Sequence, residues 1–157
     1  MRHLLKLSSA AVIGGLLLSG CASTGMAPTS PTQSANSYQL PQAVYDGYWA
    51  MTSGINGEAA VVSFRDNMSY NYRFKCYVDG RFEQLGMEKY QLRPSATAMG
   101  LQYESEPVFS AIKVVKVEPK KSLILNQSFT DPQLQQALPN GQNYSYVYKS
   151  KLEPICR

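Results

Sequence analysis

The chain has 157 residues, of which 44% are hydrophobic and 17% are charged, so it suits one domain with a buried core and is too apolar for a fully disordered chain. Two of its basic residues, Arg2 and Lys6, and its only histidine, His3, lie in a segment that we expect to be removed. Without these two bases the net charge falls from +4 to +2, which excludes the strongly basic surface of a nucleic-acid-binding protein. A mature chain without histidine also excludes Ser-His-Asp and Cys-His catalysis and His-ligated metals.

Residues 1–20 have the pattern of a signal peptide. The early basic residues precede an apolar run over 7–18, which is shorter than the roughly 20 residues of a membrane span. The run ends in Leu18-Ser19-Gly20-Cys21, which resembles the lipobox of bacterial lipoproteins. The resemblance implies cleavage before Cys21, transfer of a diacylglycerol to its thiol and acylation of the new amine. An ordinary secreted protein that begins with cysteine is the alternative.

The residues after the lipobox indicate a location and a tether. Ala22 follows the cysteine in place of aspartate, and the resemblance then implies sorting to the outer membrane. We expect the protein to face the periplasm, and display at the cell surface is the alternative. The acyl chains would hold the protein in that membrane, at about 0.8 kcal/mol for each buried methylene. Residues 22–41 carry no charge and are rich in Ser, Thr, Ala, Pro and Gln. We therefore expect 21–43 to be a lipidated cysteine with a flexible tether, and 44–157 to be the folded domain.

Two cysteines remain in the expected domain, Cys76 and Cys156. An even pair in an exported chain predicts a disulfide, because the periplasm is oxidising. The alternative, a redox-active pair, lacks the Cys-x-x-Cys spacing that is typical of that chemistry.

Residues 44–152 are rich in strand-forming residues and predict an all-β domain. Alternating patterns and turn residues predict eight strands, at 48–52, 59–64, 70–78, 82–92, 99–104, 109–117, 123–129 and 144–151. Their number and spacing fit a small antiparallel barrel or a sandwich, and we predict the barrel. One short helix is predicted near 131–138, because Asp131 suits the N-cap and Pro132 the first helical position. A loop with a single turn is the alternative.

Two strand patterns give finer predictions. In 70–78 the apolar face carries Tyr72, Phe74 and Cys76, and Asp79-Gly80 predicts a hairpin after it. A two-residue loop would place Val78 opposite Arg81, whereas a three-residue loop would place it opposite Phe82; we predict the second, because it pairs apolar residues. In 109–117 the alternation breaks between Val114 and Val115, which indicates either a bulge or two partly buried faces.

The only tryptophan lies in Gly47-Tyr48-Trp49. This resembles the Gly-x-Trp opening of lipocalins and related calycins, and it implies an eight-stranded barrel with the tryptophan closing one end. The chain departs from that family in its short mature length and in a helix placed before the last strand. A core tryptophan in an unrelated β-fold is the alternative. The resemblance implies a cavity for a small apolar ligand, and we expect its lining to include Trp49, Tyr72, Phe74 and Tyr146.

A second resemblance is to the bacterial C-type lysozyme inhibitors, which are also small β-barrel lipoproteins. The motif Phe74-Lys75-Cys76, the loop 94–103 and the late Cys156 follow the order of that family. The resemblance implies partner binding through Ser95, Gly100 and Tyr103. The loop is longer than in the family and lacks its basic residue, and the segment 44–64 is additional. A plain connecting loop is the alternative.

The sequence shows no Gly-rich phosphate loop, no Gly-x-Ser-x-Gly motif and no metal-ligand spacing. We therefore expect neither an enzyme nor a bound cofactor or metal. The function that the sequence favours is a non-catalytic, membrane-anchored binding protein with a small apolar ligand inside its barrel. The alternative is a protein-binding lipoprotein, either an inhibitor of lysozyme or of another cell-wall hydrolase, or an accessory subunit of an envelope complex.

Overall fold

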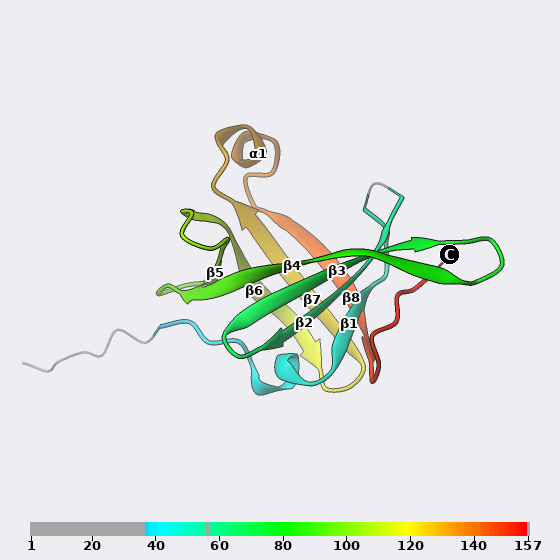
Figure 1. Ribbon diagram of the computed structural model, residues 1–157. Coiled ribbons are helices and arrows are strands. Elements are labelled where there is room, and N and C mark those ends of the chain that lie inside the picture. Colours follow the sequence, from blue (N-terminus) through cyan, green and yellow to red (C-terminus); the bar gives the residue numbers. More distant parts are fainter. Residues whose placement is uncertain (1–36, 56, 157) are drawn as a thin grey trace, which may run out of the picture. The chain divides into compact units, whose positions relative to one another are not determined.

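The structure is a computed structural model that describes residues 37–55 and 57–156 (Figure 1). The expected signal peptide, the lipobox and Cys21 lie outside these residues. No helix in the described part is long and apolar enough to cross a membrane. The elements are η1 (Gln42–Tyr45), β1 (Tyr48–Met51), β2 (Ala59–Arg65), β3 (Met68–Cys76), β4 (Phe82–Pro94), β5 (Met99–Gln102), β6 (Val108–Glu118), β7 (Ser122–Phe129), α1 (Pro132–Ala137) and β8 (Gln142–Lys149).

The eight strands form a closed antiparallel barrel in chain order, and the pairing of β1 with β8 closes it. This confirms the predicted all-β barrel with one short helix, and each predicted strand is present with its ends within two residues of the expected ones. Helix α1 is capped as expected, because the Asp131 carboxylate accepts hydrogen bonds from the N–H groups of Gln133 and Leu134 at 3.0 and 2.9 Å. The connections alternate between two ends, and α1 and η1 lie at opposite ends of the barrel (Figure 1).

The end that carries η1 is sealed by a cluster around Trp49. The Trp49 side chain is fully buried, and its indole N–H donates to the carbonyl oxygen of Val44 at 2.8 Å. Tyr148 packs edge-on against it with ring centroids 5.7 Å apart. Gly47 has φ +62°, and a Cβ there would lie 2.7 Å from the Tyr148 ring, so this position requires glycine. The Gly-x-Trp motif therefore closes one end of the barrel, as its resemblance implies.

The packed chain begins earlier than residue 44. Tyr38 donates its N–H to the carbonyl oxygen of Ser95 at 2.7 Å, and its hydroxyl accepts the N–H of Val114 at 2.7 Å. Leu40 is buried in the core together with Val44. Residues 38–43, which we expected in the tether, therefore contact the barrel and help to close it.

The two faces of β3 are exchanged relative to the prediction. The apolar face points to the outside of the barrel, and the polar face points to its interior. The strand register places Asn71 opposite Val62, whose side chain belongs to the inner core. Tyr72 and Phe74 belong instead to a separate cluster on the outer surface of the barrel. Successive residues of a strand point to opposite faces, so the polar set of β3 faces inward.

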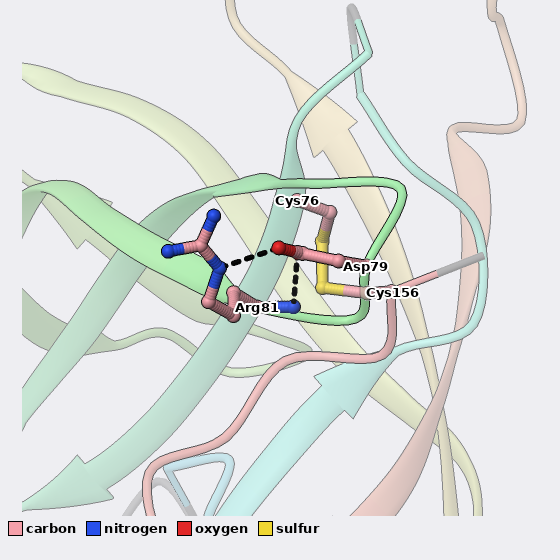
Figure 2. The surroundings of a disulfide bond; sticks show 4 residues. All are labelled: Cys76, Asp79, Arg81 and Cys156. Atoms are coloured by element: carbon pink, nitrogen blue, oxygen red, sulfur yellow. Dashed lines mark hydrogen bonds and ion pairs between the residues drawn. A yellow bond between two sulfur atoms is a disulfide. The ribbon is translucent and has the colours of Figure 1, made fainter.

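The outer cluster is covered by the C-terminal segment. Leu152 and Ile155 pack against Ala50, Val61 and Phe74, after the chain leaves β8 and runs toward the β3–β4 hairpin (Figure 1). The segment is held by the disulfide that the sequence predicted, between Cys76 and Cys156, with a Cα–Cα distance of 5.4 Å (Figure 2). The apolar face of β3 thus packs against the C-terminal segment, and its polar face points into the barrel.

The β3–β4 hairpin differs from its predicted register by two residues, because Phe82 faces Cys76 in place of Val78. The N–H of Tyr77 donates to the carbonyl oxygen of Arg81 at 2.9 Å, so the turn is Val78-Asp79-Gly80 and Val78 does not face Phe82. Gly80 adopts φ +83°, and Asp79 accepts the N–H of Arg81 at 3.1 Å (Figure 2). The loop keeps the predicted three residues but lies one residue earlier, and Phe82 meets Cys76 on the apolar face of β3.

The irregularity predicted in the sixth strand is a bulge. Val114 pairs with Leu125 and Lys116 with Ile124, so Val115 is the extra residue, and it is exposed.

The disulfide is expected to contribute a large share of the stability. Replacing Cys156 by serine should lower the free energy of unfolding by about 4 kcal/mol, because a loop with a sequence separation of 80 residues is no longer closed in the unfolded chain. Denaturant unfolding followed by Trp49 fluorescence measures this. The double variant that also carries Cys76→Ser should be no less stable than the single variant, and additive losses would contradict a bond between the two.

Candidate functional site

A cavity of about 280 Å³ opens at the end of the barrel opposite to η1. It lies between the inner faces of the strands, near the ends that lead to the β1–β2, β5–β6 and β7–β8 connections. The residues around it include Met51, Ile55, Ala60, Val62, Asn71, Arg73, Glu88, Tyr90, Leu101, Phe109, Gln127, Phe129, Tyr144 and Tyr146. The cavity therefore has one sealed end and one open end.

Aromatic side chains make much of its wall. Tyr90 and Phe109 pack edge-on with centroids 4.9 Å apart, and Tyr103 packs on the other side of Tyr90 at 6.3 Å. Tyr144 and Tyr146 come from the same face of β8, because they are two residues apart. Phe129, at the end of β7, completes this aromatic wall.

Charged groups lie near the entrance of the cavity. Arg73 donates to the Glu58 carboxylate at 3.5 Å, and the two side chains are 52% and 33% exposed. Glu88 accepts the hydroxyl of Tyr90. Both carboxylates are therefore in reach of water, and an ion pair exposed to this degree contributes little to stability.

A small recess of about 30 Å³ lies next to the cavity and shares Val62, Asn71, Leu101, Gln127 and Tyr146 with it. Ser69, Phe64, Ile112 and Leu125 complete its lining. The side-chain N–H of Asn71 donates to Ser69 Oγ at 3.0 Å, and that of Gln127 to Ser110 Oγ at 3.1 Å. Uncharged polar groups thus occur at this depth among buried aliphatic side chains.

Burial changes the acidity of two phenols in this wall. Burial raises the pKa of Tyr146, and the neighbouring Tyr144 acts in the same direction. The pKa of Tyr90 is raised first by burial and then by its hydrogen bond to Glu88. Both hydroxyls remain protonated at neutral pH and can donate hydrogen bonds.

Only one of the four residues expected to line the cavity does so with its side chain. Tyr146 lies in the wall, whereas Trp49 is packed in the sealed end. Tyr72 and Phe74 point to the outer surface, where the Tyr72 hydroxyl accepts a hydrogen bond from Arg65 at 3.2 Å. Tyr72 borders the cavity because β3 forms part of the cavity wall. Its ring lies on the outer surface of the barrel, where it packs edge-on against Tyr48.

Most residues of the cavity wall are not predicted by the sequence patterns. Asn71 alternates with apolar residues, and that pattern predicts the solvent side for it, whereas Gln127 lies between Asn126 and Ser128, where alternation assigns no face. Tyr90 and Phe109 lie on strands with no regular alternation around them. Tyr144 is the residue for which a signal exists, because it shares a strand face with Tyr146.

The three residues predicted to contact a partner do not form one surface. The Ser95 hydroxyl is engaged in its own turn, where it accepts the N–H of Ala98 at 3.1 Å. Gly100 is buried in β5, and a Cβ there would lie 3.0 Å from the carbonyl oxygen of Arg93. Tyr103 is 46% exposed and lies at the other end of β5, beside the cavity.

No family model matches the chain, and no curated protein matches it. Among solved structures, lobster apocrustacyanin A1 aligns with a TM-score of 0.40 and 11% sequence identity. The alignment covers 73% of this chain and 64% of that chain, so this chain spans less than two thirds of its length.

The buried phenol of Tyr146 predicts a loss of stability at high pH. Its pKa in the folded chain is raised above the usual 10, so the stability from the neutral phenol is complete below pH 10 and is lost as the pH rises through the folded value. The melting temperature should fall less steeply above pH 10 in Tyr146→Phe than in the parent protein. Tyr103→Phe removes an exposed phenol and should keep the parent slope, and equal slopes in all three would contradict the prediction.

Proposed function

We propose that this protein binds a small, largely apolar molecule in the barrel cavity and performs no chemistry on it. The observation that carries the proposal is the cavity of about 280 Å³ with its aromatic wall. Ligand sites in proteins start at roughly 300 Å³ and combine a mostly apolar lining with a few polar groups that fix orientation. The cavity matches the lower end of that range and has this kind of lining.

The two ends of the barrel support the same role. Trp49, Val44 and Leu40 fill the end at η1, so a ligand has the opposite end as its entrance. The apolar body of a ligand would replace water against Phe109, Phe129 and Tyr144. Removing apolar surface from water stabilises the complex by about 25 cal/mol for each Å².

A matched pair of alanine variants tests the proposal. Ala60 is half-buried on the inner face of β2 and borders the cavity, whereas Ala111 is half-buried on the outer face of β6 opposite Gly100. We expect Ala60→Phe to weaken binding of the fluorescent probe N-phenyl-1-naphthylamine by about tenfold or more, equal to about 1.4 kcal/mol, because the new ring occupies the cavity. Titration of probe fluorescence measures the dissociation constant.

The control variant Ala111→Phe should keep the parent affinity. Circular dichroism should show the same β-sheet signal and a cooperative thermal transition in both variants. Parent-like probe affinity in a folded Ala60→Phe variant would show that the probe does not enter the barrel and would count against the proposal.

We also propose that the chain is a lipoprotein of the bacterial outer membrane, facing the periplasm. The support is the run Leu18-Ser19-Gly20-Cys21 behind a short apolar segment. A lipid anchor would hold the binding barrel beside a bilayer, where apolar molecules accumulate.

Replacing Cys21 by serine tests the anchor. The variant loses the thiol that would receive the diacylglycerol, so we expect it to leave the membrane fraction after expression in a diderm bacterium. Fractionation and mass spectrometry of the N-terminal peptide would measure both effects. A Cys21→Ser chain that stays in the membrane fraction would contradict this anchor.

A further inference from the structure

The recess beside the main cavity has the size of one small chemical group. It measures about 30 Å³, and a water molecule needs roughly 10–15 Å³ of comparable space. Because five of its lining residues also line the main cavity, a ligand in the cavity can extend one end into the recess. The recess therefore has room for the end of a ligand.

Two amide side chains bring hydrogen-bonding capacity into the recess. Asn71 and Gln127 each use one N–H on a buried serine, at 3.0 and 3.1 Å, and those serines are 2% and 0% exposed. The side-chain carbonyl oxygens of the two amides accept no hydrogen bond from another described residue. The recess thus offers two hydrogen-bond acceptors, the side-chain oxygens of Asn71 and Gln127. The hydrogen bonds to the serines fix the positions of both amides.

Tyr146 adds a donor. Its side chain is 8% exposed and lines both the cavity and the recess. Its hydroxyl makes no hydrogen bond to another described residue, and because no fully buried side-chain oxygen in the described part lacks a partner, this hydroxyl is accessible to solvent and free to donate. A ligand group placed between Tyr146 and the two amides would meet one donor and two acceptors.

The described lining of the recess carries no formal charge. It consists of aliphatic residues, Phe64, Ser69, the two amides and Tyr146. The nearest charged residues named in the cavity wall, Arg73 and Glu88, are exposed near the entrance. Glu88 lies opposite Asn71 on β4, but its side chain is exposed, so for a charged group in the recess a solvated counter-ion offsets little of the lost hydration. A neutral polar group loses less and regains its hydrogen bonds.

We propose that the ligand enters head first and places an uncharged hydroxyl in the recess between Asn71, Gln127 and Tyr146. Its apolar body then lies against the aromatic wall of the cavity. The ligand class is that of apolar alcohols, as opposed to carboxylates or other charged amphiphiles of the same length. This inference rests on the proposed binding function and specifies the chemistry of that same site.

Competition against N-phenyl-1-naphthylamine tests the head group, with 1-octanol and octanoate as competitors at pH 8. The readout is the ratio of the two displacing concentrations, octanoate over octanol. The greater apolarity of the alcohol acts alike in every variant, so the change of this ratio between variants reports on the recess alone. We expect octanol to displace the probe at a lower concentration from the parent protein.

The change in this ratio is measured in two variants of residues that line the recess, called the inner variants, and in one matched control variant. Gln127→Met removes an acceptor and Tyr146→Phe removes only a hydroxyl, and each should lower the ratio by about tenfold, which corresponds to one lost hydrogen bond of about 1.4 kcal/mol. Gln84→Met makes the same amide change on the outer face of β4, opposite Phe74, and should keep the parent ratio. Having two inner variants covers the case in which loss of the Gln127–Ser110 bond unfolds the chain.

The outcomes separate the two proposals. Absence of probe binding to the parent protein would overturn the binding function itself. Probe binding that Ala60→Phe abolishes, together with an unchanged ratio in Gln127→Met and Tyr146→Phe, would leave that function standing and overturn the hydroxyl subsite. A ratio that falls in both inner variants and not in Gln84→Met supports the subsite.

Discussion

The structure depends on the way in which strand β3 is buried on both of its faces. A strand alternates its side chains, so one face of β3 must carry Tyr72 and Phe74 and the other Asn71 and Arg73. In a barrel with an open outer surface the apolar set has to turn inward. Here the C-terminal segment, fixed by the Cys76–Cys156 bond, provides a second apolar contact outside the barrel. The polar set can therefore face the interior, and the cavity gains its hydrogen-bonding groups in this way.

The sealed end limits where a cavity can form. Gly47 lets the chain approach Tyr148 closely, Trp49 bonds to Val44, and Leu40 packs beside them. Together these residues fill the barrel at η1, so the unfilled space is confined to the other end. The same contacts make the segment before β1 part of the fold, which is why the packed chain starts ahead of the boundary that composition alone predicted.

The sequence predicts the strands well because alternation and turn residues are local signals. It predicts the disulfide because only two cysteines remain in the domain, and it identifies Trp49 as the closure of the barrel through its glycine neighbour. Alternation does not say which face is inside, since exchanging the two faces of β3 leaves the pattern unchanged. The deciding contact comes from Leu152 and Ile155, about 80 residues away along the chain from Phe74, and no local pattern of β3 contains it. The hairpin after β3 shows the same limit on a smaller scale, because Phe82 faces Cys76 in place of Val78, and both pairings are apolar.

The interior polar residues are also the strongest sign that this barrel is built for binding. A barrel of this size reaches its highest stability when aliphatic side chains fill it, and a buried amide or hydroxyl needs a partner to avoid a penalty of about 1–3 kcal/mol. Ser69 pairs with Asn71 and Ser110 with Gln127, and no buried side-chain nitrogen or oxygen atom of the described residues lacks a hydrogen-bond partner. Such groups contribute less to the fold than aliphatic residues would in the same places. Departures of this kind from a well-packed core are expected where function sets the residue, and in this chain they gather around a single recess that opens into the cavity.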